Sequence, residues 1–195
     1  MTPPAPFVIV VTGSECTGKT TLAAELAARL GAPCSEEFAR RYVGRKGAPL
    51  GASDVEAIAR GQIAGEDAAL AAAARVVVKD TDLVSTVVYA RHYYGCCPAW
   101  IERAARERAG DLYLLLHPDV PWVADGPYRD RPAARAELHG LFEAALAEFG
   151  AKAIDILGDW GARRARALAA LRAWGQIQDS GASSGSGPTP CIPRG

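Results

Sequence analysis

Runs of consecutive apolar residues recur along this chain and predict its strands. A run without alternating polar positions is typical of a strand that is covered on both faces. The four clearest runs are Phe7 to Val11, Arg75 to Lys79, Leu112 to Leu116 and Lys152 to Leu157. A fifth, shorter strand is expected near Pro33 to Ser35, because Gly31 and Pro33 are residues that end helices.

Between these runs the apolar positions follow a helical period. Leu22, Leu26 and Leu30 share one face of a helix, and Ser53-Asp-Val-Glu56 has the pattern of a capping box that opens a long Ala-rich helix to about Ala74. Another helical stretch is expected to begin at Glu36. Further helices are predicted at Leu83 to Tyr94, Pro98 to Ala109, Ala133 to Phe149 and Ala162 to Trp174.

Strands that alternate with helices predict an α/β fold of about five parallel strands, with helices on both faces of the sheet. In such folds ligands bind at the carboxyl ends of the strands. The 195 residues suffice for one domain, which we expect at 1–175. Residues 176–195 are rich in Gly, Ser and Pro, and we expect them to form a disordered tail.

Composition narrows the classes of partner and compartment. Lys plus Arg and Asp plus Glu each number 22, so no net positive charge attracts nucleic acid or an acidic membrane surface. Five cysteines without CxxC spacing and three scattered histidines predict neither a disulfide framework nor a zinc site. No signal peptide or membrane span is recognisable, so we expect a cytoplasmic protein without nucleic-acid or membrane partners. The oligomeric state is not predictable.

The segment Gly13-Ser-Glu-Cys-Thr-Gly-Lys-Thr20 matches the phosphate-loop pattern G-x-x-x-x-G-K-[ST], between a predicted buried strand and an amphipathic helix. It predicts a P-loop NTPase fold with ATP and Mg²⁺ as cofactors. Glycines let successive N–H groups face the phosphates, Lys19 is expected to reach the β- and γ-phosphates, and Thr20 to bind Mg²⁺. Glu15 and Cys16 could equally be ordinary loop residues. The predicted nucleotide-binding residues are Gly13, Ser14, Glu15, Cys16, Thr17, Gly18, Lys19, Thr20 and Thr21.

Two acids, Asp80 and Asp82, follow the third long strand at the same predicted edge. Phosphoryl transfer to a hydroxyl needs a carboxylate near the attacking oxygen and an acid that holds Mg²⁺ or its waters. We assign Asp80 together with Thr20 to the metal, and leave open which of the two acids is the general base. Asp82 could instead only cap the helix that begins at Leu83.

A loop-like stretch from His117 to Arg131 follows the fourth long strand and is a candidate lid. Arg129 and Arg131 could stabilise charge on the transferring phosphoryl group when the lid closes. Alternatively they pair with Asp125 and Asp130 on the surface. Tyr42, Tyr93 and Trp122 could stack on a flat ring or could simply pack in the core.

Together these motifs resemble the nicotinamide riboside kinase domain of NadR-type proteins, a branch of the P-loop kinase-like ATPases. The resemblance spans roughly Phe7 to Trp174. Its landmarks are GSECTGKTT at Gly13, EFARRYV at Glu37, DTDLVSTVVYARHYYG at Asp80 and DLYLLLHPDVPWVADGPYRDR at Asp111. Substrate-side positions implied by the resemblance are Glu37, Arg40, Tyr42, Asp80, Thr81, Asp82, Thr86, Tyr93, Trp122, Asp125 and Gly126.

The resemblance implies ATP-dependent phosphorylation of the ribose 5′-hydroxyl of nicotinamide riboside, a step of NAD biosynthesis. NadR proteins also carry an adenylyltransferase domain with an HxGH motif; the sequence has no such motif, so adenylylation of the mononucleotide is not expected. Two alternatives stay open: a kinase for another nucleoside or small hydroxyl compound, and a regulatory ATP- or GTP-binding module.

Overall fold

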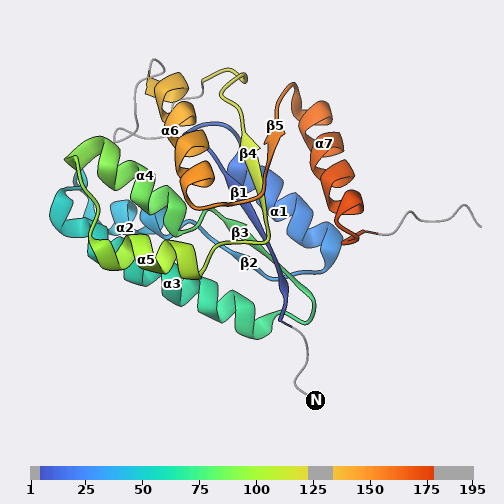
Figure 1. The fold of residues 1–195 in the computed structure, drawn as a ribbon, viewed down its shortest axis with the longest axis horizontal. Coiled ribbons are helices and arrows are strands. Elements are labelled where there is room, and N and C mark those ends of the chain that lie inside the picture. The colour runs from blue at the N-terminus through green and yellow to red at the C-terminus, as the bar shows by residue number, and fades with distance from the viewer. Residues whose placement is uncertain (1–4, 123–133, 178–195) are drawn as a thin grey trace, which may run out of the picture.

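The computed structural model describes residues 5–122 and 134–177. Its strands form one parallel sheet in the order β2-β3-β1-β4-β5 (Figure 1). Strand β1 lies in the centre, with β3 on one side and β4 on the other. The bounds are β1 (Phe7–Thr12), β2 (Cys34–Ser35), β3 (Val76–Asp80), β4 (Leu112–Leu116) and β5 (Ala153–Ile156). The predicted five-stranded P-loop NTPase fold is confirmed.

Helices cover both faces of this sheet (Figure 1). One face packs against α1 (Lys19–Leu30) and α7 (Trp160–Ala173). The other face packs against α3 (Val55–Ala72), α4 (Leu83–Tyr94), α5 (Ala99–Glu107) and α6 (Ala134–Glu148). Helix α2 (Phe38–Lys46) follows β2 and packs on α3.

The apolar runs are explained by this two-faced burial. Along β1, Ile9 and Val11 point into the core under α1 and α7, whereas Val10 points into the core under α3 to α6. All three side chains are fully buried. Because successive residues of a strand face opposite sides, a strand between two helical layers needs an apolar residue at every position.

The start of α3 differs from the sequence-based expectation. Ser53 is exposed, and the predicted capping box at Ser53 is wrong. A short 3₁₀ helix, η1 (Ala52–Asp54), precedes α3, and the Asp54 carboxylate accepts the Gly51 N–H at 2.7 Å. The same carboxylate accepts the Tyr42 hydroxyl at 3.0 Å and pairs with Lys46. Asp54 therefore ties the end of α2 to the start of α3, which local sequence patterns cannot show.

Among the described helices, none is both long enough and apolar enough to cross a membrane. The predicted lid residues Asp125, Gly126, Arg129, Asp130 and Arg131 lie outside the described residues, as does most of the predicted tail.

Candidate active site

The phosphate loop connects β1 to α1 at the carboxyl edge of the sheet. Gly13, Cys16 and Gly18 have positive φ angles of 131°, 54° and 87°. A Cβ on Gly13 would lie 2.6 Å from the Leu116 carbonyl oxygen, so a larger residue would push the loop away from β4. The glycines therefore provide the backbone curl that a phosphate cradle requires.

Helix α1 begins at this loop with an N-terminus suited to an anion. Its N-cap is Gly18, which has no side chain to occupy the first N–H groups, and its first turn carries no acid. The Lys19 side chain is buried, and its Nζ donates to the Ser14 carbonyl at 2.8 Å. The loop thus places one buried ammonium beside amides that can bind phosphate oxygens.

Thr20 and Asp80 form the polar pair beside Lys19. The Thr20 hydroxyl donates to the Asp80 carboxylate, and Asp80 also senses the charges of Lys19, Arg40 and Glu37. Burial raises the pKa of Asp80 above its ordinary value, and the hydrogen bond from Thr20 opposes that shift. Asp80 Oδ1 is buried without a hydrogen-bond partner. An unsatisfied carboxylate oxygen next to an exposed hydroxyl fits the oxygen ligands that Mg²⁺ prefers.

Two buried arginines hold the loop from outside. Arg135 at the start of α6 donates to the Cys16 carbonyl at 3.3 Å and to the Val120 carbonyl at 3.0 Å. Arg163 of α7 donates to the Thr17 carbonyl at 2.9 Å. Both arginines bind carbonyl oxygens, so neither guanidinium competes with a phosphate for the N–H groups of the loop. Sequence analysis missed these residues, because an arginine in an amphipathic helix usually faces solvent.

A cleft of about 1200 Å³ extends from the phosphate loop between α2, α3 and α4. It is lined by the loop from Glu15 to Thr21 and also by Glu37, Arg40 and Tyr93. Tyr93 stacks on Tyr89 with an interplanar angle of 8° and a centroid distance of 6.0 Å. The structure therefore brings most of the predicted loop residues into one cavity with five predicted substrate-side residues, which are Glu37, Arg40, Thr81, Thr86 and Tyr93.

Two of the predicted aromatic residues do not line this cleft. The Tyr42 hydroxyl is bound to Asp54, and its ring packs against Phe38. The Trp122 ring lies 5.7 Å from the Arg135 guanidinium, on the outer side of the loop. Among the described residues, those that line the cleft include neither Tyr42 nor Trp122.

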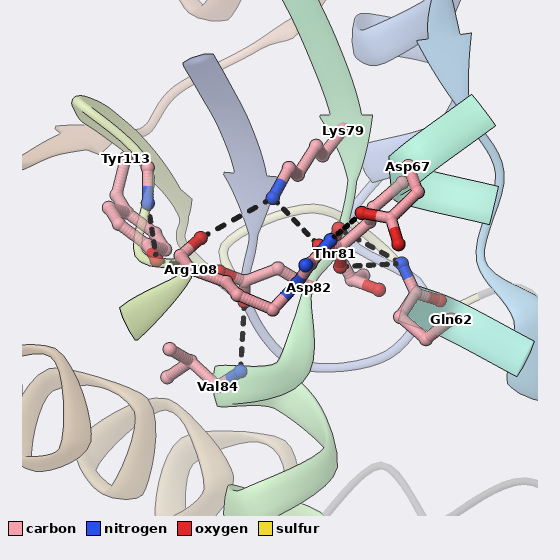
Figure 2. A network of polar contacts seen from close by, with 10 residues as sticks. Gln62, Asp67, Lys79, Thr81, Asp82, Val84, Arg108 and Tyr113 are labelled. Atoms are coloured by element: carbon pink, nitrogen blue, oxygen red, sulfur yellow. Dashed lines mark hydrogen bonds and ion pairs between the residues drawn. The ribbon is translucent and has the colours of Figure 1, made fainter. Parts of the chain in front are cut away.

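Asp82 is buried, and its side chain lies near Tyr113 and Val84 (Figure 2). Its carboxylate accepts the Val84 N–H at 3.0 Å and the Tyr113 hydroxyl at 2.6 Å. Burial, followed by the negative charge of Glu66, raises the pKa of Asp82 to about 6. The cap on α4 is confirmed, whereas the expected pairing of both acids beside the phosphate loop is not found.

A buried ion pair lies next to Asp82. Lys79, which Figure 2 labels, donates from its Nζ to Glu66 Oε2 at 2.8 Å. The two side chains are 2% and 0% exposed. Gln62 connects this pair to the cleft, because its Nε2 lies 3.3 Å from Glu66 Oε1 and 3.5 Å from the Thr81 carbonyl. Thr81 has a positive φ of 63°, an uncommon conformation for this residue type, and it lines the cleft. The network supports a strained turn at the edge of the site.

Trp160 is a further cleft residue that the sequence analysis missed. It opens α7 after the carboxyl end of β5, the edge at which ligands bind. A Cβ on Gly18 would lie 2.2 Å from its ring, so the indole rests directly on the phosphate loop. The sequence signal for Trp160 is its position directly after Gly158 and Asp159, which follow the end of a predicted strand.

The chain matches the family described as an AAA domain over residues 8–163. It is 34% identical over 122 residues to the trifunctional NAD biosynthesis/regulator protein NadR of Escherichia coli (strain K12), and equally to that of Salmonella typhimurium. Each match covers 60% of this chain and 30% of the relative.

Solved structures of NadR proteins are also similar to this chain. A NadR protein in complex with NR is 28% identical, with a TM-score of 0.78 over 89% of this chain and 52% of that chain. A NadR protein in complex with NAD and AMP-PNP has a TM-score of 0.71 over 89% and 50%. Thymidylate kinase from Ehrlichia chaffeensis, at 15% identity and a TM-score of 0.65 over 87% and 100%, shares the fold. The chain spans about half of these NadR chains and less of the curated relatives.

Proposed function

Because this chain belongs to the AAA domain family and is similar to NadR proteins, we propose that it is an ATP-dependent kinase of nicotinamide riboside. The product is nicotinamide mononucleotide, formed by phosphoryl transfer to the ribose 5′-hydroxyl. One observation carries this proposal: the phosphate loop and the wall of Glu37, Arg40 and Tyr93 line the same cleft. The NR of the solved NadR complex, which we take as nicotinamide riboside, supports the choice of acceptor.

The nucleotide end of the cleft is assigned to the phosphate loop. Its N–H groups and the start of α1 bind the phosphates, and Lys19 leaves the Ser14 carbonyl to reach the β- and γ-phosphates. Thr20 and Asp80 would hold Mg²⁺, which neutralises phosphate charge when it is bound. Asp80, rather than Asp82, is the acid at the reacting atoms, because the Asp82 carboxylate is already bound to Tyr113 and Val84.

The part of the cleft that Tyr89 and Tyr93 line is assigned to the nucleoside. The nicotinamide ring of the riboside is a flat cation, and the stacked rings of Tyr89 and Tyr93 offer the faces that bind such a cation. Glu37 adds a carboxylate that can accept ribose hydroxyls or attract the ring charge. Arg40 lies near Asp80 and can attract the transferred phosphoryl group. The remaining predicted residues, Arg129, Arg131 and Asp125, are proposed for a lid.

The direct test is a product assay with purified protein, ATP and Mg²⁺. Nicotinamide riboside should yield the mononucleotide by mass, and uridine should react much more slowly. Equal rates on uridine would indicate a general nucleoside kinase, whereas no product from any acceptor would favour a regulatory nucleotide-binding module.

A matched pair of variants localises the acceptor site. Glu37→Gln should raise KM for the riboside at least tenfold with little change in KM for ATP, because Glu37 lines the cleft and we assign its carboxylate to the riboside. Glu36→Gln is the control, since the neighbouring Glu36 is exposed and does not line the cleft. Equal kinetics of the two variants would contradict the assignment.

A further inference from the structure

Two of the three histidines of the sequence meet at a site on the outer side of the phosphate loop. His117 follows β4, and His139 lies on α6; their ring centroids are 4.1 Å apart. Asp155 of β5 completes the group, with Oδ1 at 2.9 Å from His117 Nε2. One ligand atom from each of the three residues lies within 4.8 Å of the other two. Three separate elements thus bring two imidazoles and a carboxylate together.

His139 is the member that ordinary packing does not explain. The residue is 8% exposed, and both of its ring nitrogens are buried without a hydrogen-bond partner. Buried polar side chains are nearly always satisfied by protein, water or an ion. The nearest carboxylate on its own helix is Glu143, with Oε1 at 3.6 Å from Nε2, beyond hydrogen-bond distance. The unsatisfied ring therefore points to a ligand.

We propose that His117, His139 and Asp155 bind a divalent transition-metal ion of the zinc class. Two imidazoles and one carboxylate are a donor set for Zn²⁺ and related ions, whereas Mg²⁺ prefers oxygen ligands. Ligands of a tetrahedral zinc ion lie roughly 3.4 Å apart, given bonds of about 2.1 Å. The three ligand atoms lie within 4.8 Å of one another, so binding would require small side-chain movements that bring them to this spacing.

The surrounding charges favour a cation. Asp119 and Glu143 add negative charge near His139, in addition to Asp155. The Arg163 guanidinium beside the site is already engaged, because it pairs with Asp119 and donates to the His117 carbonyl at 2.7 Å. The same guanidinium holds the Thr17 carbonyl of the phosphate loop. An ion at this site would fasten α6 to β4 and β5 and stiffen the outer support of the loop, without taking part in phosphoryl transfer.

The test is a titration of the purified, nucleotide-free protein with Zn²⁺ in excess Mg²⁺, followed by calorimetry. We expect one saturable equivalent, and Co²⁺ used as a spectroscopic probe should show visible bands without the sulfur charge-transfer absorption of a cysteine site. His117→Gln and Asp155→Asn should each weaken binding at least tenfold. Asp155 is exposed, so its variant should fold even if a histidine variant does not.

His92→Gln is the matched control, because His92 on α4 is the third histidine and lies outside the group. It should bind Zn²⁺ as the unaltered protein does. Binding that does not saturate at one equivalent, a sulfur absorption with Co²⁺, or equal affinity in Asp155→Asn would overturn the proposal. None of these readouts depends on kinase activity, so they test the metal site independently of the proposed function.

Discussion

Arg163 donates a hydrogen bond to the carbonyl oxygen of Thr17 at 2.9 Å, although the two residues are 146 positions apart. The same buried guanidinium donates to the carbonyls of Gly158 and His117. Arg163→Met should therefore leave several carbonyl groups unsatisfied and lower the unfolding free energy by about 3 kcal/mol. Thermal unfolding would show this as a loss of several degrees, and KM for ATP should rise.

Arg164→Met provides the control for this change. Arg164 pairs with Glu25 at the surface, where solvent screens the two charges and the pair contributes little to stability. Similar melting temperatures for the two variants would show that Arg163 does not support the loop.

Lys19→Ala should leave the melting temperature nearly unchanged while phosphoryl transfer falls by orders of magnitude. The lysine is positioned to contact charge that develops in the transition state, so its removal affects the rate more than the fold. Lys152→Ala is a suitable comparison, because Lys152 lies far from the cleft against Trp174. Undiminished turnover in folded Lys19→Ala protein would contradict the assignment of Lys19 to the phosphates of ATP.

Asp80→Asn and Asp82→Asn should differ in their effect on the rate of phosphoryl transfer. Asp80 bonds to Thr20 beside Lys19, so its variant should reduce kcat by at least a hundredfold with little loss of stability. Asp82 is bound to Tyr113 and Val84 in the core, so its variant should retain most of the rate. Single-turnover assays and thermal melts on both proteins distinguish the roles. A larger rate loss in Asp82→Asn would reverse them.

Asp82 should also give stability a dependence on pH. In the folded protein its pKa is raised to about 6, whereas in the unfolded chain it titrates near its usual value of about 3.9. Between these values the folded protein binds the extra proton, so Asp82 makes the unfolding free energy fall as pH rises from about 4 to 6. Asp82→Asn should remove this contribution. Urea denaturation at pH 4.5 and 7 should therefore show the variant gaining stability relative to the unaltered protein at the higher pH, and a constant difference would contradict the shift.

The Lys79–Glu66 pair should respond strongly to the loss of one partner. Glu66→Gln leaves the Lys79 ammonium buried without its counter-charge, which should lower the unfolding free energy by about 3–5 kcal/mol. Lys79→Met combined with Glu66→Gln should recover much of that loss. Glu56→Gln breaks an exposed pair with Arg60 and should change little in urea denaturation. Additive losses in the double variant would argue against a coupled pair.

The sheet and the phosphate loop were predictable because their determinants are local. The run FVIVV followed by a glycine-rich loop and a leucine-faced helix carries the strand, the cradle and the helix within one stretch of sequence. The position of Asp80 could also be predicted, since it ends a buried strand at the ligand-binding edge. These features depend only on residue type and on the period of the apolar positions along the sequence.

The supports of the site could not be predicted, because they depend on contacts between distant segments. Nothing near Asp82 in the sequence shows that Tyr113 will occupy its carboxylate, and nothing near Thr17 indicates Arg163. The three scattered histidines likewise gave no expectation of a metal site, although folding brings His117 and His139 together. Pairings of this kind appear only once the strand order is known.

The central place of β1 in the sheet sets an order of events during biosynthesis. This strand is synthesised before both of its neighbours in the sheet, and its Val8 N–H bonds to Asp111, 103 residues later. Contacts between such distant segments slow folding. An apolar first strand must therefore remain unpaired until β3 and β4 have been synthesised, and it is the segment of the nascent chain most in need of shielding from aggregation. The phosphate loop gains its last support only after Arg163 has emerged, so an incomplete chain should not bind nucleotide.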